Sequence, residues 1–103
     1  MTHRQGRFES LVSSLAAKYI EKNIEGALVT VTNIFLPSDL KKVIIYTSIL
    51  PEEKESEILA LLQEKKEGLR RFLGEEIKTR FVPEVEIEID PGRKTRELID
   101  QLS

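Results

Sequence analysis

Basic residues are concentrated in one segment of this 103-residue sequence, and their chemistry suits phosphate binding. Segment 65–80 carries six lysines and arginines and three glutamates, although the formal net charge of the whole chain is −2. Ammonium and guanidinium groups donate charge-assisted hydrogen bonds to phosphate oxygens, so this segment is the candidate nucleic-acid contact. We predict that the binding residues are Lys65, Lys66, Gly68, Arg70, Arg71, Lys78 and Arg80, together with the N-terminal Arg4 and Arg7.

Gly68 is the unusual member of this set, because it stands inside an otherwise helical pattern. A glycine there costs roughly 1 kcal/mol relative to alanine, which indicates either a bend or a close approach to the backbone. We expect a break between two helices at this residue. The free N–H groups at the start of the second helix would then attract phosphate oxygens.

Catalytic and metal-binding patterns are missing from the sequence. It contains no cysteine, and its one histidine, His3, lies near the N-terminus. The carboxylates fall on expected helix and strand faces without a companion base, whereas general acid–base catalysis needs a shielded pair with perturbed pKa values. No glycine-rich phosphate loop and no metal-ligand spacing occurs. We therefore expect no enzymatic activity, no catalytic residues, no metal, no cofactor and no small-molecule substrate.

Length and composition predict a single domain spanning residues 1–103. The sequence has no run of eighteen apolar residues that could span a membrane, and residues 1–6 lack the apolar centre of a secretory signal. The absence of cysteine suits a reducing compartment. We expect a soluble, cytoplasmic protein that is a monomer and has no membrane partner.

Hydrophobic periodicity predicts the elements that must position these residues. Apolar spacings of three and four indicate helices, and alternation indicates strands. Pro37, Ser38 and Asp39 form the expected turn between the first two strands. The predicted elements are a helix over 7–23, strands over 27–36 and 43–49, a helix over 50–66, a second helix after Gly68, a strand over 85–90 and a short helix over 95–102.

These elements predict an α+β fold. The short connection between the first two strands implies an antiparallel hairpin, and the helical crossover should return the third strand to the same sheet. The result is a two-layer sandwich of order α-β-β-α-α-β(-α), with the helices on one face. Glutamates on the outer side of the third strand do not suit base stacking, and we expect Phe35 and Tyr46 to be isolated aromatics in core or rim packing.

Several segments together resemble a known family. They are the turn PSDLKK running into VIIYTSIL, the run LRRFLGEEI after Gly68, and RFVPEV leading into a strand that ends at Asp90. In combination they resemble the ribosome-binding factor A family, whose fold is a KH-like domain of type II topology with a three-stranded mixed sheet. The resemblance places the family's Ala-x-Gly kink between two helices at residues 66–68, where this chain has Lys66 in the alanine position.

The resemblance implies a non-enzymatic assembly factor. Such a protein would bind the immature small ribosomal subunit and its rRNA, assist late maturation and take part in cold adaptation, with its positive helix face on phosphates. The alternative is a KH-like domain used mainly for protein–protein contacts, through an exposed sheet edge or the acidic face. Weakening of association by salt would favour the first, and association that is insensitive to salt would favour the second.

Overall fold

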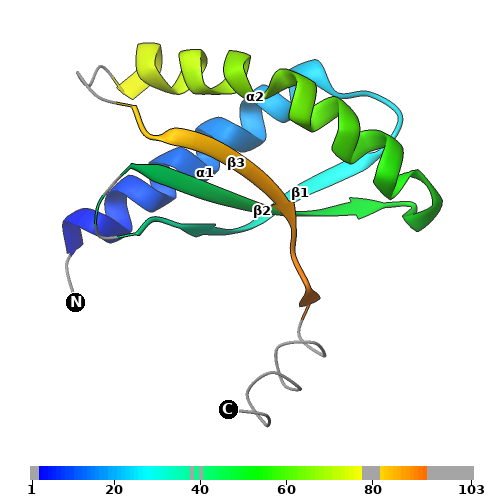
Figure 1. The fold of residues 1–103 in the computed structure, drawn as a ribbon, viewed down its shortest axis with the longest axis horizontal. Coiled ribbons are helices and arrows are strands. Elements are labelled where there is room, and N and C mark those ends of the chain that lie inside the picture. The colour runs from blue at the N-terminus through cyan, green and yellow to red at the C-terminus, as the bar shows by residue number, and fades with distance from the viewer. Residues whose placement is uncertain (1–2, 38, 40, 78–81, 93–103) are drawn as a thin grey trace, which may run out of the picture.

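The computed structural model describes residues 3–37, 39, 41–77 and 82–92, with side chains from residue 6 onward. The described strands and the helices around them follow one another in the expected order, except that one helix stands where two were expected (Figure 1). Helix α1 is longer at its N-terminal end than the periodicity suggested, and each strand begins and ends within one residue of its predicted limits. The elements are α1 (His3–Asn23), β1 (Leu28–Phe35), β2 (Lys42–Leu50), the 3₁₀ turn η1 (Glu52–Lys54), α2 (Glu55–Ile77) and β3 (Glu84–Ile89).

The three strands form one mixed sheet in the order β1-β2-β3. Strands β1 and β2 are antiparallel, with Leu28 opposite Leu50 and Phe35 opposite Ile44, and the register shifts at a bulge between Val31 and Asn33. Strand β3 runs parallel to β2 because the chain returns through α2 before it re-enters the sheet. The predicted hairpin and mixed sheet are therefore confirmed.

One core fills the space between the sheet and the helices. Alternate residues of β2 are buried and their neighbours are partly exposed, so the inner face of the sheet is set by a period of two. Helix α1 crosses behind the sheet and α2 runs alongside β3 (Figure 1). The predicted α+β architecture is confirmed. The core is made of Val12, Ala16, Ile20, Ile24, Ile34, Leu36, Val43, Ile45, Ile49, Ile58, Leu62, Leu69, Leu73, Val85 and Ile87.

Thr47 is the one buried polar residue among the core positions of the described residues. Its side chain is 0% exposed and lies on β2, the central strand. The hydroxyl donates a hydrogen bond to the Glu88 carbonyl oxygen on β3 at 3.1 Å. A buried hydroxyl needs such a partner, and this one adds a link between the parallel strands.

Helix α2 is continuous through Gly68, which corrects the prediction of two separate helices. It spans 23 residues, and the positive-φ glycines of the described chain are Gly26 and Gly92. Figure 1 shows the axis of α2 changing direction near its middle, so the chain bends here without leaving the helix. The N–H of Gly68 lies inside this helix, and the proposed phosphate site at the start of a second helix is therefore wrong.

Two further expectations concern the ends of the chain and the membrane. The predicted helix over 95–102 lies outside the described residues. Within the described ranges, neither helix is long and apolar enough to cross a membrane.

Candidate nucleic-acid interface

At Gly68 of α2 a side chain of α1 approaches the helix backbone closely. A Cβ added to Gly68 would lie well inside 3.0 Å of the Tyr19 hydroxyl oxygen of α1, and 3.4 Å from the ring carbon that carries it. The same hydroxyl lies 3.5 Å from the Lys65 carbonyl oxygen, and the Tyr19 ring packs against Phe72 with 5.5 Å between centroids. Of the two explanations for a mid-helix glycine, the close approach is thus confirmed, and the approaching group is a side chain of the same protein.

Two of the predicted binding cations contact the edge strand β3 or the segment just before it. Lys66 Nζ lies 3.3 Å from Glu86 Oε2, and Arg70 Nη2 donates to the Val82 carbonyl oxygen at 3.2 Å. Gln63, one turn before Lys66, donates from Nε2 to the Ile87 carbonyl oxygen at 2.8 Å. Residues spaced by three and four lie on one side of a helix, so this row faces the edge of the sheet.

The row formed by Gln63, Lys66 and Arg70 is called the edge brace below. Gln63 and Lys66 supply donors to β3, which has only β2 as a neighbour among the described strands, and Arg70 donates to Val82 just before it. Open strand edges tend to pair with other chains, and covering them with a helix suppresses this. The positive charges of the brace therefore have a structural function that composition alone did not reveal.

Arg71 lies on the solvent-exposed side of α2, opposite the buried residues of this helix, and its neighbours there are acidic. Glu67 and Glu75 precede and follow it by four residues, and both are exposed. Glu57 and Glu64 continue the same stripe toward the start of the helix. A phosphate approaching Arg71 would therefore meet several carboxylates, and the exposed side of α2 is an acidic surface.

Those predicted binding residues that the structure describes do not come together on one surface. Lys65 is half-buried and lines a small depression beside Tyr19, on a different side of α2 from the edge brace. The side chain of Arg4 and all of Lys78 and Arg80 lie outside the described residues. A role of these residues in binding RNA stays a prediction, but a continuous ridge over Lys65–Arg71 is absent from the described part of α2.

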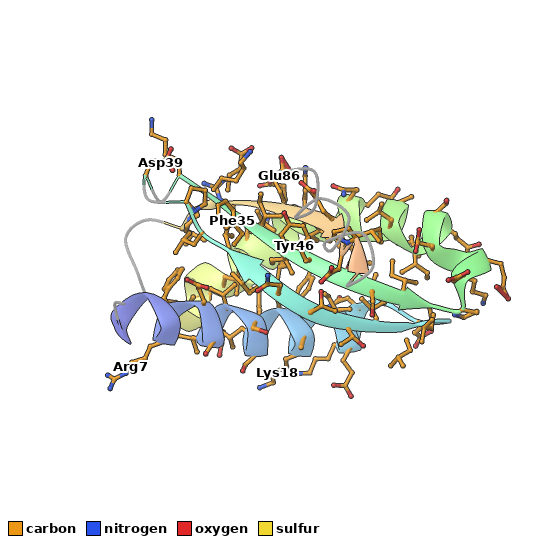
Figure 2. All side chains as sticks on the ribbon, turned by 90° about the horizontal axis from the view of Figure 1, so that it is seen from below. Arg7, Lys18, Phe35, Asp39, Tyr46 and Glu86 are labelled. Atoms are coloured by element: carbon orange, nitrogen blue, oxygen red, sulfur yellow. The ribbon has the colours of Figure 1, made fainter. Side chains whose placement is uncertain are left out.

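Helix α1 presents a basic surface, of which the sequence analysis predicted only the N-terminal residues Arg4 and Arg7. Arg7, Lys18 and Lys22 are exposed, and none forms an ion pair with another described residue. Figure 2 shows Arg7 and Lys18 both pointing away from the sheet. Of the described side chains on this face, Glu21 is the acidic one. The spacing 7, 18, 22 keeps these cations on one side of a helix, a signal that was available in the sequence.

The described side chains offer nothing that would hold a metal ion. No group of three or more histidines, aspartates or glutamates converges within the described ranges.

Comparison with known proteins decides the family. A family model described as ribosome-binding factor A matches residues 4–103. A curated ribosome-binding factor A from Bdellovibrio bacteriovorus is 32% identical over 91 residues, which cover 84% of this chain and 68% of the relative. The chain belongs to the ribosome-binding factor A family.

Structures of ribosome-binding factor A share the fold of this chain. The crystal structure of ribosome-binding factor A from Thermus thermophilus matches with a TM-score of 0.71 at 21% identity, covering 80% of this chain and 91% of the other. A homology model of the Thermus thermophilus ribosome-binding factor A, fitted into a cryo-EM map of a 30S complex, matches with a TM-score of 0.65 at 21% identity. That match covers 76% of this chain and 86% of the other. At these identities the likeness shows the fold.

Proposed function

We propose that this protein is a non-enzymatic assembly factor that binds the immature small ribosomal subunit and its rRNA and assists late maturation. The observation that carries the proposal is the match of the ribosome-binding factor A family over residues 4–103. The similar Thermus thermophilus protein, described in a 30S complex, supports the small subunit as partner. The proposal includes a monomer that acts in the cytoplasm, with a contribution to growth in the cold.

The surface we assign to rRNA is the exposed side of α1 that carries Arg7, Lys18 and Lys22, called the basic face below. Phosphate contacts come mainly from lysine and arginine, and they supply most of the sequence-independent affinity for nucleic acid. The cations of the basic face form no ion pair with a described residue, whereas α2 exposes an acidic stripe. Arg4 belongs to the same helix and is a further predicted contact, and Lys78 and Arg80 stay predicted contacts as well.

The mechanism is stabilisation of one rRNA conformation. A ligand shifts a conformational equilibrium only through a difference in its affinity for the two states. Cations on a rigid helix bind phosphates best when the RNA holds them at matching positions. The acidic stripe of α2 repels RNA that approaches from the other side, which limits binding to the wrong sites.

Sedimentation with isolated small subunits tests this proposal. The variant Arg7→Glu with Lys18→Glu should weaken association and reduce the slope of log affinity against log salt by about 1.4 to 1.8, because each phosphate contact contributes about 0.7 to 0.9. The matched variant is Lys65→Glu with Arg71→Glu, which makes the same change of charge on α2. It should bind nearly as the parent does, and thermal melts should show both variants folded.

Three results would contradict parts of the proposal. Loss of binding only in the α2 variant would move the rRNA contact from the basic face to α2. Association that does not respond to salt would favour the alternative, a KH-like domain used for protein contacts. Failure of the folded parent protein to sediment with small subunits would remove the assigned partner.

A further inference from the structure

No described helix covers the outer face of the sheet, and this face carries aromatic side chains. The register places Asn33 opposite Tyr46 and Phe35 opposite Ile44, so Phe35 and Tyr46 are diagonal neighbours on one face. Figure 2 shows Phe35, Tyr46 and Glu86 on the side of the sheet away from α1. Phe35 is 51% exposed. The expectation of two isolated aromatics in core or rim packing is therefore wrong, since they share one open surface.

A groove with a fixed wall lies between these aromatics. Asn33, Phe35, Tyr46 and Pro91 line an open depression of about 230 Å³. Pro91 is held there because Asp90 is fixed on both sides. The backbone N–H of Asp90 donates to the Thr47 carbonyl oxygen at 2.8 Å, and the Asp90 carboxylate accepts hydrogen bonds from the Gly92 N–H and the Thr32 hydroxyl. A groove that exists before binding costs less entropy to fill than a mobile one.

Carboxylates flank the groove on the β3 side. Glu86 lies beside Ile44 and Glu88 beside Tyr46 in the parallel register, and Glu84 lies beside Lys42. Glu86 is partly neutralised by the edge brace, but Glu84 and Glu88 are exposed and form no ion pair with another described residue. Lys42 is the cation of this strip, so the strip is acidic overall.

This combination selects for a cationic protein segment over RNA. Single-stranded RNA also stacks on aromatics, but it requires positive neighbours for its phosphates, and here the neighbours are carboxylates. Lysine and arginine side chains lay their aliphatic stems on apolar surface and interact with aromatic faces, while their charged ends reach carboxylates. Apolar or aromatic side chains of the same segment would fill the groove.

We propose that the Phe35–Tyr46 groove is a docking site for an extended, lysine- or arginine-rich segment of a partner protein that also carries apolar or aromatic side chains. Its basic residues pair with Glu84 and Glu88, and its apolar side chain lies between Phe35, Tyr46 and Pro91. This site is on the opposite layer of the molecule from the basic face, so it does not depend on the proposed rRNA contact.

Fluorescence anisotropy with a short labelled peptide of alternating lysine and tyrosine tests the proposal on the full chain. The comparison probes are the same peptide with glutamate in place of lysine, and an oligouridylate. We expect the basic peptide alone to bind, with amide NMR shifts centred on Asn33, Phe35 and Tyr46. Phe35→Ser and Glu88→Lys should each weaken binding about tenfold, equivalent to about 1.4 kcal/mol. Glu57→Lys makes the same charge change on α2 and should leave binding unchanged.

Other outcomes overturn the proposal. Tighter binding of the oligouridylate, lost in Phe35→Ser, would make the groove a base-stacking site. Equal weakening by Glu88→Lys and Glu57→Lys would show a general charge effect. Peptide binding that appears only after Arg93, Lys94 and Arg96 are replaced by serine would identify this chain's own basic segment as the occupant. Because no ribosomal particle is used, these results are independent of the test of subunit binding.

Discussion

Replacing Gly68 with alanine tests how the two helices fit together. The added Cβ would lie well under 3.0 Å from the Tyr19 hydroxyl oxygen, a separation that real Cβ atoms do not show. Tyr19 must therefore shift, which strains its packing on Phe72 and its 3.5 Å contact with the Lys65 carbonyl oxygen. Overpacking of this kind costs about 1–3 kcal/mol.

The opposing contribution is helix propensity. Alanine is more favourable than glycine inside a helix by about 0.8–1.0 kcal/mol. In the parent protein, Gly68→Ala should therefore lower the free energy of unfolding by up to about 2 kcal/mol. In a Tyr19→Phe background the nearest atom is the ring carbon at 3.4 Å, so the same substitution should raise the free energy of unfolding by about 0.5–1 kcal/mol. The difference between the two backgrounds is a coupling energy of about 1–3 kcal/mol.

Urea unfolding followed by circular dichroism measures this coupling. The midpoint should shift at an unchanged slope, and each kcal/mol should move the melting temperature by about 4–8 °C. Gly6→Ala is the control, because Gly6 lies in α1 with nothing within 4 Å of the added Cβ, and its effect should not depend on residue 19. If Gly68→Ala changes the free energy of unfolding equally with tyrosine and with phenylalanine at position 19, the Tyr19 hydroxyl is not the reason that position 68 requires glycine.

The remaining predictions concern polar contacts inside the fold. Gln63→Leu should lower the free energy of unfolding by about 1 kcal/mol in urea titrations, because a β3 carbonyl oxygen loses its side-chain donor. Thr47→Val should cost a similar amount, about 1 kcal/mol in the same assay, and an unchanged stability would show that the buried hydroxyl bond contributes nothing net. A double-mutant cycle on Lys66 and Glu86 should give a coupling of about 0.2–1 kcal/mol that shrinks as salt rises, and a larger coupling that ignores salt would contradict this assignment as a half-exposed ion pair.

The strands and their pairing were predictable because their patterns are local. Alternation in residues 85–90 and the apolar run 43–49 place the core face directly, and the length of the connections decides which pair is antiparallel. The same alternation could have located Phe35 and Tyr46. With Ile34 and Ile45 on the core face, their chain neighbours must point outward.

The neighbouring residues in the sequence could not show why position 68 is a glycine. Its partner Tyr19 lies in another helix, and the contact between them exists only once both helices pack on the sheet. A bend and a close approach produce the same local signal, a glycine in a helical pattern. Two separate helices were therefore predicted where one continuous helix is found.

The placement of the basic residues around α2 differs from the expectation for another reason. Net charge over residues 65–80 counts positions along the chain, whereas a helix distributes those positions around its axis. The spacing Glu67, Arg71, Glu75 already indicated an acidic side, and helical projection would have shown it. That Lys66 reaches Glu86 of β3 and Arg70 reaches Val82 before this strand depended on tertiary structure and could not be foreseen.

The edge brace makes charge-reversal scanning of α2 ambiguous. A glutamate at position 66 or 70 would face the backbone and carboxylates of β3, so the strand would loosen whether or not RNA ever touches this helix. Weakened subunit binding in such a variant would then report damage to the scaffold. Only variants whose melting curves match that of the parent protein can identify the residues of the proposed small-subunit contact.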